Sequence, residues 1–134
     1  MAYIEVNFPG GKRVDAHVRD RVISTDQPTR AGGDGSAPTP FELFLSSIAT
    51  CAGIYALGFC ESKGLSTEGL KLHMDLVKDK ETKMITDIKM HLDLPKDFPA
   101  KYEKAILRSM DLCAVKKHMF QPPAFHITAE TISE

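Results

Sequence analysis

The sequence has almost no net charge. Its 17 Lys and Arg residues and 18 Asp and Glu residues give a formal charge of -1 at pH 7. A protein that binds nucleic acid or an anionic membrane through charge carries a basic surplus, which is lacking here. The N-terminus also lacks the basic region and apolar run of a secretory signal. We therefore predict a cytoplasmic protein that binds neither nucleic acid nor membrane.

Cysteine is scarce, and its spacing fits no common metal site. The three cysteines stand at positions 51, 60 and 113, and the sequence contains no CxxC or HxxxH pattern. In a cytoplasmic protein this number argues against a structural disulfide framework and leaves core thiols or redox chemistry. We expect no metal and no other cofactor.

The only stretch that is apolar on every side runs from Thr39 to Gly64. Its start carries a capping box, with Thr39 as the cap, Pro40 at the first helical position and Glu42 two residues later. Gly64 is a typical residue at a helix end. A helix without a polar face belongs in a core or a membrane. Because serines, Thr50 and two glycines interrupt the stretch, we predict the buried core helix of a soluble domain.

Alternating apolar and polar residues predict strands on both sides of this helix. The expected elements are strands at 2–8, 12–18 and 21–26, a long loop at 27–38, a hairpin of strands at 69–79 and 83–94 with a bulge near 87–88, a helix from about 98, a short helix at 111–119 capped by Asp111, and a strand at 124–132. This order is an α+β pattern. It predicts a single domain over 1–134 in which two antiparallel sheets wrap one central helix.

The cysteines can be interpreted either as structural thiols or as reactive ones. Cys51 in mid-helix is either a packing thiol or, with a cation nearby, a nucleophile. Cys60 lies nine residues further along and faces away from Cys51, so we expect a structural thiol that cannot pair with it. Cys113 is predicted in the first turn of a helix, where unpaired N–H groups favour a thiolate, and Lys116 and Lys117 follow one turn on. Its alternative is a half-buried thiol at a helix junction.

The segment GGDGSAPTPFELFLSSIATC resembles the OsmC/Ohr family, osmotically inducible protein C and organic hydroperoxide resistance protein. In that family a Gly-rich loop and a Pro-containing helix start precede a cysteine on a central helix. The later segment CAVKKHM resembles the second family signature, a cysteine at a helix start that is followed by the last strand. The resemblance covers nearly the whole chain. It implies an intertwined homodimer with two active sites at the subunit interface, and a cysteine peroxidase that prefers organic hydroperoxides.

Carried over by position, Cys51 resembles the peroxidatic thiol and Cys113 the resolving thiol. The mechanism this implies is a sulfenic acid on Cys51 that condenses with Cys113 into a disulfide. An external dithiol, a lipoylated protein in parts of the family, then reduces the disulfide.

The family also places a glutamate and an arginine over the reactive thiolate. Phe41 stands at the position of that glutamate, and Glu42 follows one residue later. The Gly-Gly turn that precedes the family's arginine is followed here by Lys12 and then Arg13. Lys12, Arg13 and Arg30 are the candidate cations, and we expect Arg13 or Arg30, oriented by Glu42 or by the 27–38 loop, to activate Cys51.

A second function from a different class fits the same resemblance. The chain is then a divergent family member that binds a small hydrophobic ligand or a partner in the same pocket without turnover. Phe41 at the glutamate position favours this alternative. The pKa of Cys51 separates the two functions, because a peroxidase needs a thiolate.

Overall fold

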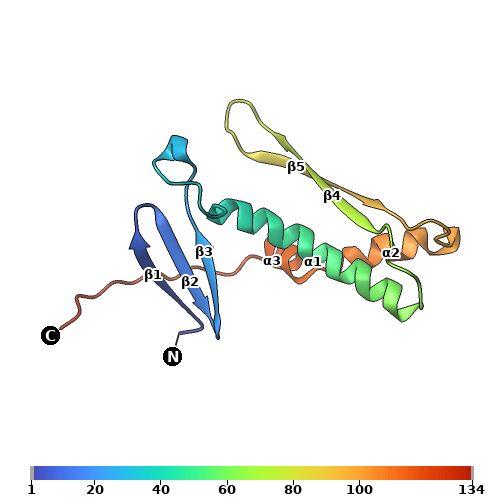
Figure 1. Cartoon of the computed structure of the whole chain (residues 1–134), viewed down its shortest axis with the longest axis horizontal. Coiled ribbons are helices and arrows are strands. Elements are labelled where there is room, and N and C mark those ends of the chain that lie inside the picture. The colour runs from blue at the N-terminus through green and yellow to red at the C-terminus, as the bar shows by residue number, and fades with distance from the viewer. Residues whose placement is uncertain (1, 134) are drawn as a thin grey trace. The chain divides into compact units, whose positions relative to one another are not determined.

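The computed structural model describes residues 2–133 and shows an α+β chain with two antiparallel sheets and three α-helices (Figure 1). In chain order the elements are β1 Ile4–Gly10, β2 Arg13–Val18, β3 Arg21–Thr25, the 3-10 turn η1 Thr29–Ala31, α1 Pro40–Ser62, β4 Lys71–Lys78, β5 Ile85–Asp93, the 3-10 turn η2 Ala100–Tyr102, α2 Glu103–Met110 and α3 Ala114–Phe120. The α+β class and the two antiparallel sheets are confirmed. The chain forms two compact units, one ending at Ser47 and one beginning at Ile48, and α1 runs through the boundary. That both units act as one domain stays a prediction.

The first sheet exposes an apolar face. β1, β2 and β3 lie side by side in that order with antiparallel neighbours. Ile4, Val6 and Phe8 alternate along β1 and therefore share one face, with Val18 and Ala16 opposite the first two. All seven residues of β1 are exposed, and Phe8 is 79% exposed. Because the apolar face of a sheet normally packs against another layer, this face lacks its cover in a single chain.

The second sheet, the β4–β5 hairpin, is built in the opposite way. On its outer face Lys71 is opposite Asp93, and Asp75 is opposite Lys89, so unlike charges meet across the strands. Its inner residues pack against the buried core: Leu72, Met90 and Leu92. The hairpin therefore has the predicted alternation, with apolar residues inward and charged residues outward.

The start and end of α1 agree with the sequence signals. The Glu42 carboxylate accepts a hydrogen bond from the Thr39 N–H at 3.0 Å, and the Thr39 hydroxyl accepts one from the Glu42 N–H at 3.1 Å. At the other end Gly64 has a φ of 65°, and the Leu65 N–H hydrogen-bonds to the Cys60 carbonyl at 2.8 Å. These two arrangements are the capping box and the left-handed glycine terminus that the sequence predicts.

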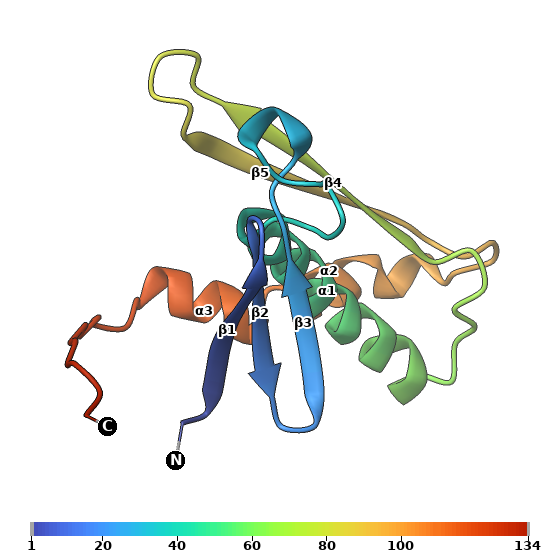
Figure 2. The same ribbon diagram turned by 60° about the vertical axis from the view of Figure 1, so that its left-hand side comes forward.

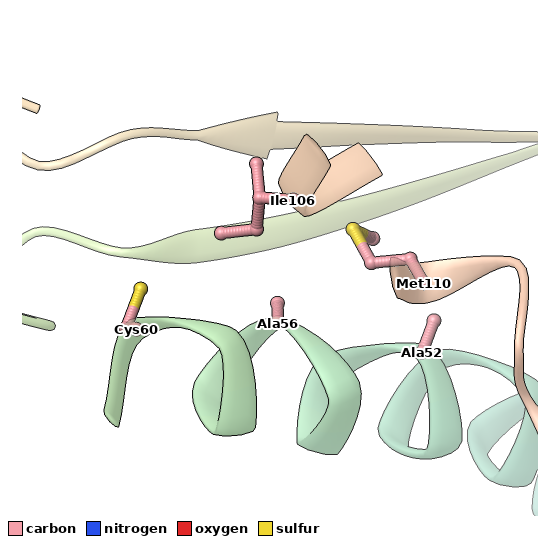
Figure 3. Packing of buried hydrophobic residues seen from close by; sticks show 5 residues of the cluster. All are labelled: Ala52, Ala56, Cys60, Ile106 and Met110. Carbon is pink, nitrogen blue, oxygen red and sulfur yellow. The ribbon is translucent and has the colours of Figure 1, made fainter. Parts of the chain in front are cut away.

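The prediction that α1 is buried on all sides is wrong for the single chain. Its fully buried residues are four apart and form one stripe: Ile48, Ala52, Ala56 and Cys60. Part of this stripe packs against Ile106 and Met110 of α2 (Figure 3). Elsewhere on the helix Phe41 is 54% exposed and Ile54 is 57% exposed. By length and composition α1 could also cross a membrane, a test that the core helix of a soluble protein passes as well.

The predicted strand at 124–132 is also wrong for the single chain. After α3 the described residues, up to 133, form no helix or strand (Figure 2). Phe125 and Ile127, two residues apart as in a strand, are 83% and 91% exposed. A strand exists only when a neighbour completes its hydrogen-bond ladder, and here the segment has none.

Two smaller features can be compared with their predicted positions. The bulge expected near Asp87 is confirmed, because Val77 pairs with Asp87 and Lys78 with Ile85, which leaves Thr86 as the extra residue of β5. Asp111 ends α2 instead of capping the next helix, because its N–H still hydrogen-bonds to the last turn of α2. Cys113 is consequently the N-cap of α3 and not a residue of its first turn.

A buried carboxylate that the sequence analysis did not single out holds the 27–38 loop. Asp26 is 0% exposed. Its Oδ1 accepts the Gln27 N–H at 2.7 Å, and its Oδ2 accepts the Ser36 hydroxyl at 2.6 Å, the Ser36 N–H at 3.0 Å and the Asp34 N–H at 3.3 Å. The hydrogen bonds from Ser36, first its hydroxyl, lower the pKa of Asp26 from 3.8 to about 2. The loop closes so tightly that a Cβ at Gly33 would collide with the Gln27 carbonyl.

We expect Asp26→Asn to loosen this loop and to lower the midpoint of thermal unfolding at pH 7. The amide would present an NH₂ group to donors that now meet an oxygen. Because the folded-state pKa of Asp26 is depressed, its stabilisation is present above its unfolded pKa and is lost as pH falls from about 4 to about 2. The difference in unfolding midpoint between the two proteins should therefore shrink over that pH range, which calorimetry can measure.

Asp34→Asn is the matched control, since it removes one charge from the same loop while keeping the backbone N–H that Asp26 uses. Equal unfolding midpoints for Asp26→Asn and the unmodified protein at pH 7 would contradict the anchoring role.

Candidate active site

Packing between α1 and α2 brings two cysteines together. Ala52 of α1 and Met110 of α2 belong to one buried cluster (Figure 3). Cys51 directly precedes Ala52, and Cys113 follows Met110 by three residues. The thiols of Cys51 and Cys113 are hydrogen-bonded to each other, and both are free. The core contact between the helices therefore positions a pair of thiols at its edge.

The surroundings of Cys51 favour its thiolate. Its side chain is half-buried. The hydrogen bond from the Cys113 thiol is the largest cause that lowers the pKa of Cys51, and the backbone N–H groups of Val115 and Ala114 at the start of α3 lower it further. Partial burial opposes these hydrogen bonds without reversing the direction. Donors that point at a sulfur stabilise its negative charge, so Cys51 is the more acidic thiol of the pair.

The prediction that Cys113 has a lowered pKa at the helix start is wrong. Its side chain is 1% exposed. Burial is the largest cause that raises the pKa of Cys113, followed by its hydrogen bond to Cys51. The N–H groups of Lys116 and Val115 act in the other direction but do not outweigh burial. The surroundings of the pair thus lower the pKa of Cys51 and raise the pKa of Cys113.

Cys60 belongs to the core. Its side chain is 0% exposed in the buried cluster, and burial raises its pKa. A buried neutral thiol of this kind behaves as a small apolar side chain.

The predicted partners of Cys51 lie in the first compact unit, whereas Cys51 lies in the second. Arg13 donates a hydrogen bond to the Gly10 carbonyl at 3.3 Å and lines a hollow of about 350 Å³. The hydrogen bonds of the capping box lower the pKa of Glu42, and the charge of Arg30 contributes least. The structure thus brings Arg30 near Glu42, while contact of Arg13, Arg30 or Glu42 with Cys51 stays a prediction.

An apolar hollow begins one helical turn beyond Cys51. Its volume is about 400 Å³. The lining residues come from α1 and α2: Ile54, Tyr55, Gly58, Phe59, Ser62 and Ser109. Tyr55 follows Cys51 by four residues, which places both on the same face of the helix. A Cβ at Gly58 would meet no atom within 4 Å, so the hollow is open at that point.

Among the described residues no group of three or more His, Cys, Asp and Glu side chains is arranged to hold a metal ion. On the outer face of β4–β5, His73 and His91 contact the Asp93 carboxylate at 2.7 Å and 3.3 Å. All three side chains are exposed and belong to the water-facing side of the hairpin.

Comparison with known proteins identifies the family and the fold. A family model described as OsmC-like protein matches residues 33–128. No curated protein is similar enough to match.

Solved structures resemble the fold over most of their length. A protein from Psychrobacter arcticus 273-4 named for an osmotic stress induced and detoxification response has a TM-score of 0.72 and 20% identity, with 87% of each chain covered. An OsmC-like protein from Mycoplasma pneumoniae has a TM-score of 0.66 and 15% identity, with 91% of this chain and 89% of that chain covered. An organic hydroperoxide resistance protein OsmC from Legionella pneumophila has a TM-score of 0.55 and 16% identity, with 89% and 90% covered.

We expect Cys51 to react with iodoacetamide at a lower pH than the other two thiols, because donors lower its pKa and burial raises theirs. Mass spectrometry of the peptides, after short exposure of the reduced protein across pH 6 to about 10, measures each thiol separately. Cys113→Ser keeps a hydroxyl donor near Cys51 and should change its pKa less than Cys113→Ala does.

Two further variants test the predicted cations. Arg13→Met or Arg30→Met should raise the pKa of Cys51 if that guanidinium reaches it. A pKa of Cys51 above about 9 in the unmodified protein, unchanged by all of these replacements, would contradict the lowered pKa of Cys51.

Proposed function

Because the chain belongs to the OsmC-like family, we propose that it is a thiol peroxidase that reduces organic hydroperoxides. The observation that carries this proposal is the contact between two free thiols whose pKa values shift in opposite directions. A peroxidase with two cysteines needs one thiolate to attack and one thiol to resolve. The similar Legionella pneumophila structure bears the name of an organic hydroperoxide resistance protein, which supports the choice of substrate.

The proposed first step is attack of the Cys51 thiolate on the hydroperoxide. The sulfur forms a bond to the terminal oxygen, the O–O bond breaks, and the alkoxide leaves as an alcohol after taking a proton. Cys51 is oxidised to a sulfenic acid, and the peroxide is reduced by two electrons. The N–H groups of Val115 and Ala114 that point at the sulfur stabilise the thiolate before the attack.

In the proposed second step Cys113 attacks the sulfenic sulfur. A disulfide forms, and the hydroxyl group leaves as water with the proton of the Cys113 thiol. The Cys113 thiol hydrogen-bonds to Cys51 in the reduced protein, so we expect this step to need no unfolding of either helix. We propose an external dithiol, such as the lipoyl group of a protein, as the reductant that returns both thiols.

The apolar hollow beyond Tyr55 supports a substrate with a hydrocarbon body. A ligand that fills about 400 Å³ would bury apolar surface against Ile54 and Phe59. Its reactive group would then lie at the Cys51 end of the hollow.

The alternative is a protein that binds a hydrophobic ligand in this hollow without turnover. The observation that favours it is Phe41, which stands at the family's glutamate position and packs against Phe44 with ring centroids 5.6 Å apart. A phenyl ring cannot orient an arginine by hydrogen bonds. Without the charge of an oriented arginine beside it, Cys51 would remain a neutral thiol, as this alternative requires.

We expect Cys51→Ser to abolish consumption of cumene hydroperoxide with dihydrolipoamide as reductant, because the nucleophile is lost. Without a reductant, Cys113→Ser should consume one equivalent to form the sulfenic acid and a second equivalent to form the sulfinic acid, since no resolving thiol traps the sulfenic acid. Cys60→Ser is the control and should keep full turnover.

Mass spectrometry of the oxidised unmodified protein should find a link between Cys51 and Cys113 and leave Cys60 free. Two results together would favour the binding protein. The first is that no hydroperoxide is consumed, and the second is that an apolar fluorescent probe binds saturably to the unmodified protein but not to Gly58→Phe.

We also propose a homodimer, since three apolar surfaces are open in the single chain. They are the face of β1–β3, the side of α1 that carries Ile54, and the segment after α3 with Phe125 and Ile127. An extended segment with alternating apolar residues can add to an open sheet edge of a second copy, and β1 is such an edge.

Light scattering should therefore give twice the chain mass of 14.8 kDa at micromolar concentration. Removal of residues 122–134 should shift the protein toward the monomer, because the added strand is lost. Phe125→Ser with Ile127→Ser keeps the length and should weaken the dimer as well, whereas His126→Ser between them should not. A monomer mass for the unmodified chain would refute the proposal.

A further inference from the structure

The start of α3 has little in its own sequence to stabilise it. The helix has seven residues, with a cysteine at its N-cap and no acidic residue in its first turn. Ser, Thr, Asp and Asn are the preferred N-caps, and a negative charge is the favourable one at this end of a helix. Lys116, the third residue of α3, has the unfavourable sign. A helix this short is marginal without outside support.

An ion pair across the turn supplies such support. The Lys116 ammonium contacts the Asp111 carboxylate at 2.6 Å. Asp111 is the residue that ends α2, so the pair spans the turn that contains Cys113. The contact neutralises the lysine and brings a carboxylate to the positive end of α3. It thereby offsets both unfavourable features of this helix start.

The same turn supplies the three groups whose hydrogen bonds lower the pKa of Cys51. Cys113 provides the thiol, and Ala114 and Val115 provide the N–H groups. If the first turn of α3 frays, the sulfur of Cys51 loses its donors and the resolving thiol together. The ion pair contributes little free energy by itself. Its effect on Cys51 can still be large, because it holds the turn that carries the donors.

We propose that Asp111 and Lys116 are positioning residues whose ion pair holds the start of α3, and with it Cys113, against Cys51. The inference deepens the proposed peroxidase function and rests on it for the importance of the disulfide. The contact between the two thiols in the reduced protein does not depend on that function. Exposed ion pairs of this kind change an equilibrium constant by about two- to fivefold and are screened by salt.

The first measurement uses the reduced protein and no peroxide. Lys116→Met and Asp111→Asn should each slow the reaction of Cys51 with iodoacetamide near neutral pH by about two- to fivefold at low salt. Lys116→Arg retains a cation that can bind the carboxylate and should restore the rate. Lys117→Met removes the same charge one residue along and is the matched control, so it should leave the rate unchanged.

The second measurement is the equilibrium between the thiol pair and its disulfide in dithiothreitol buffers. Lys116→Met should reduce the equilibrium constant for the disulfide of Cys51 and Cys113 by a similar factor. The double variant with Asp111→Asn should show no further loss, since both changes break one contact. Unfolding midpoints of the same variants report general stability, and Lys116→Met should move the thiol equilibrium by more than Lys117→Met at an equal midpoint.

The outcomes separate this inference from the peroxidase proposal. Slower alkylation in Lys116→Met and Asp111→Asn, in a protein that consumes no hydroperoxide, would keep the positioning role and reject the peroxidase. Equal alkylation rates in Lys116→Met, Lys117→Met and the unmodified protein would overturn the positioning role, whatever the peroxidase assay shows.

Discussion

The close packing of α1 against α2 is the constraint on which the candidate site depends. Ala52 and Ala56 carry only a methyl group, so the larger side chains of Ile106 and Met110 can lie directly over the helix (Figure 3). Any bulkier residue in this stripe would push α2 outward. Since α2 ends three residues before Cys113, such a shift would also move the Cys113 thiol away from Cys51. A hydrophobic contact thus sets the distance at which the proposed redox chemistry operates.

Local signals in the sequence were enough to predict most of the secondary structure. Thr39 and Glu42 determine where α1 begins, through hydrogen bonds between residues close in the chain. The alternation in β4 and β5 likewise follows from one buried and one charged face. These features could be predicted because each depends on residues close in the chain or on a periodic pattern.

The features that were missed depend on partners far apart in sequence. Asp26 looks like an ordinary loop residue, and only the folded loop shows that its carboxylate collects donors up to ten residues away. The pKa of Cys113 was expected to follow its helix end, whereas burial decides it. The strand expected at 124–132 has the right pattern but no neighbour in its own chain. The pattern of apolar residues predicts which surface is apolar, but it does not predict which part of the protein covers that surface.

The positions of the two thiols in the chain have a consequence for the mechanics of the second compact unit. A bond between Cys51 and Cys113 would close about sixty residues into a covalent ring that contains β4, β5 and α2. Closing a ring of that length removes chain entropy from the unfolded state equivalent to about 4 kcal/mol. The oxidised chain would then be the more resistant to heat and to proteases, and reduction would release the ring. If the proposed peroxidase cycle operates, each turnover would alternately constrain and release most of this unit.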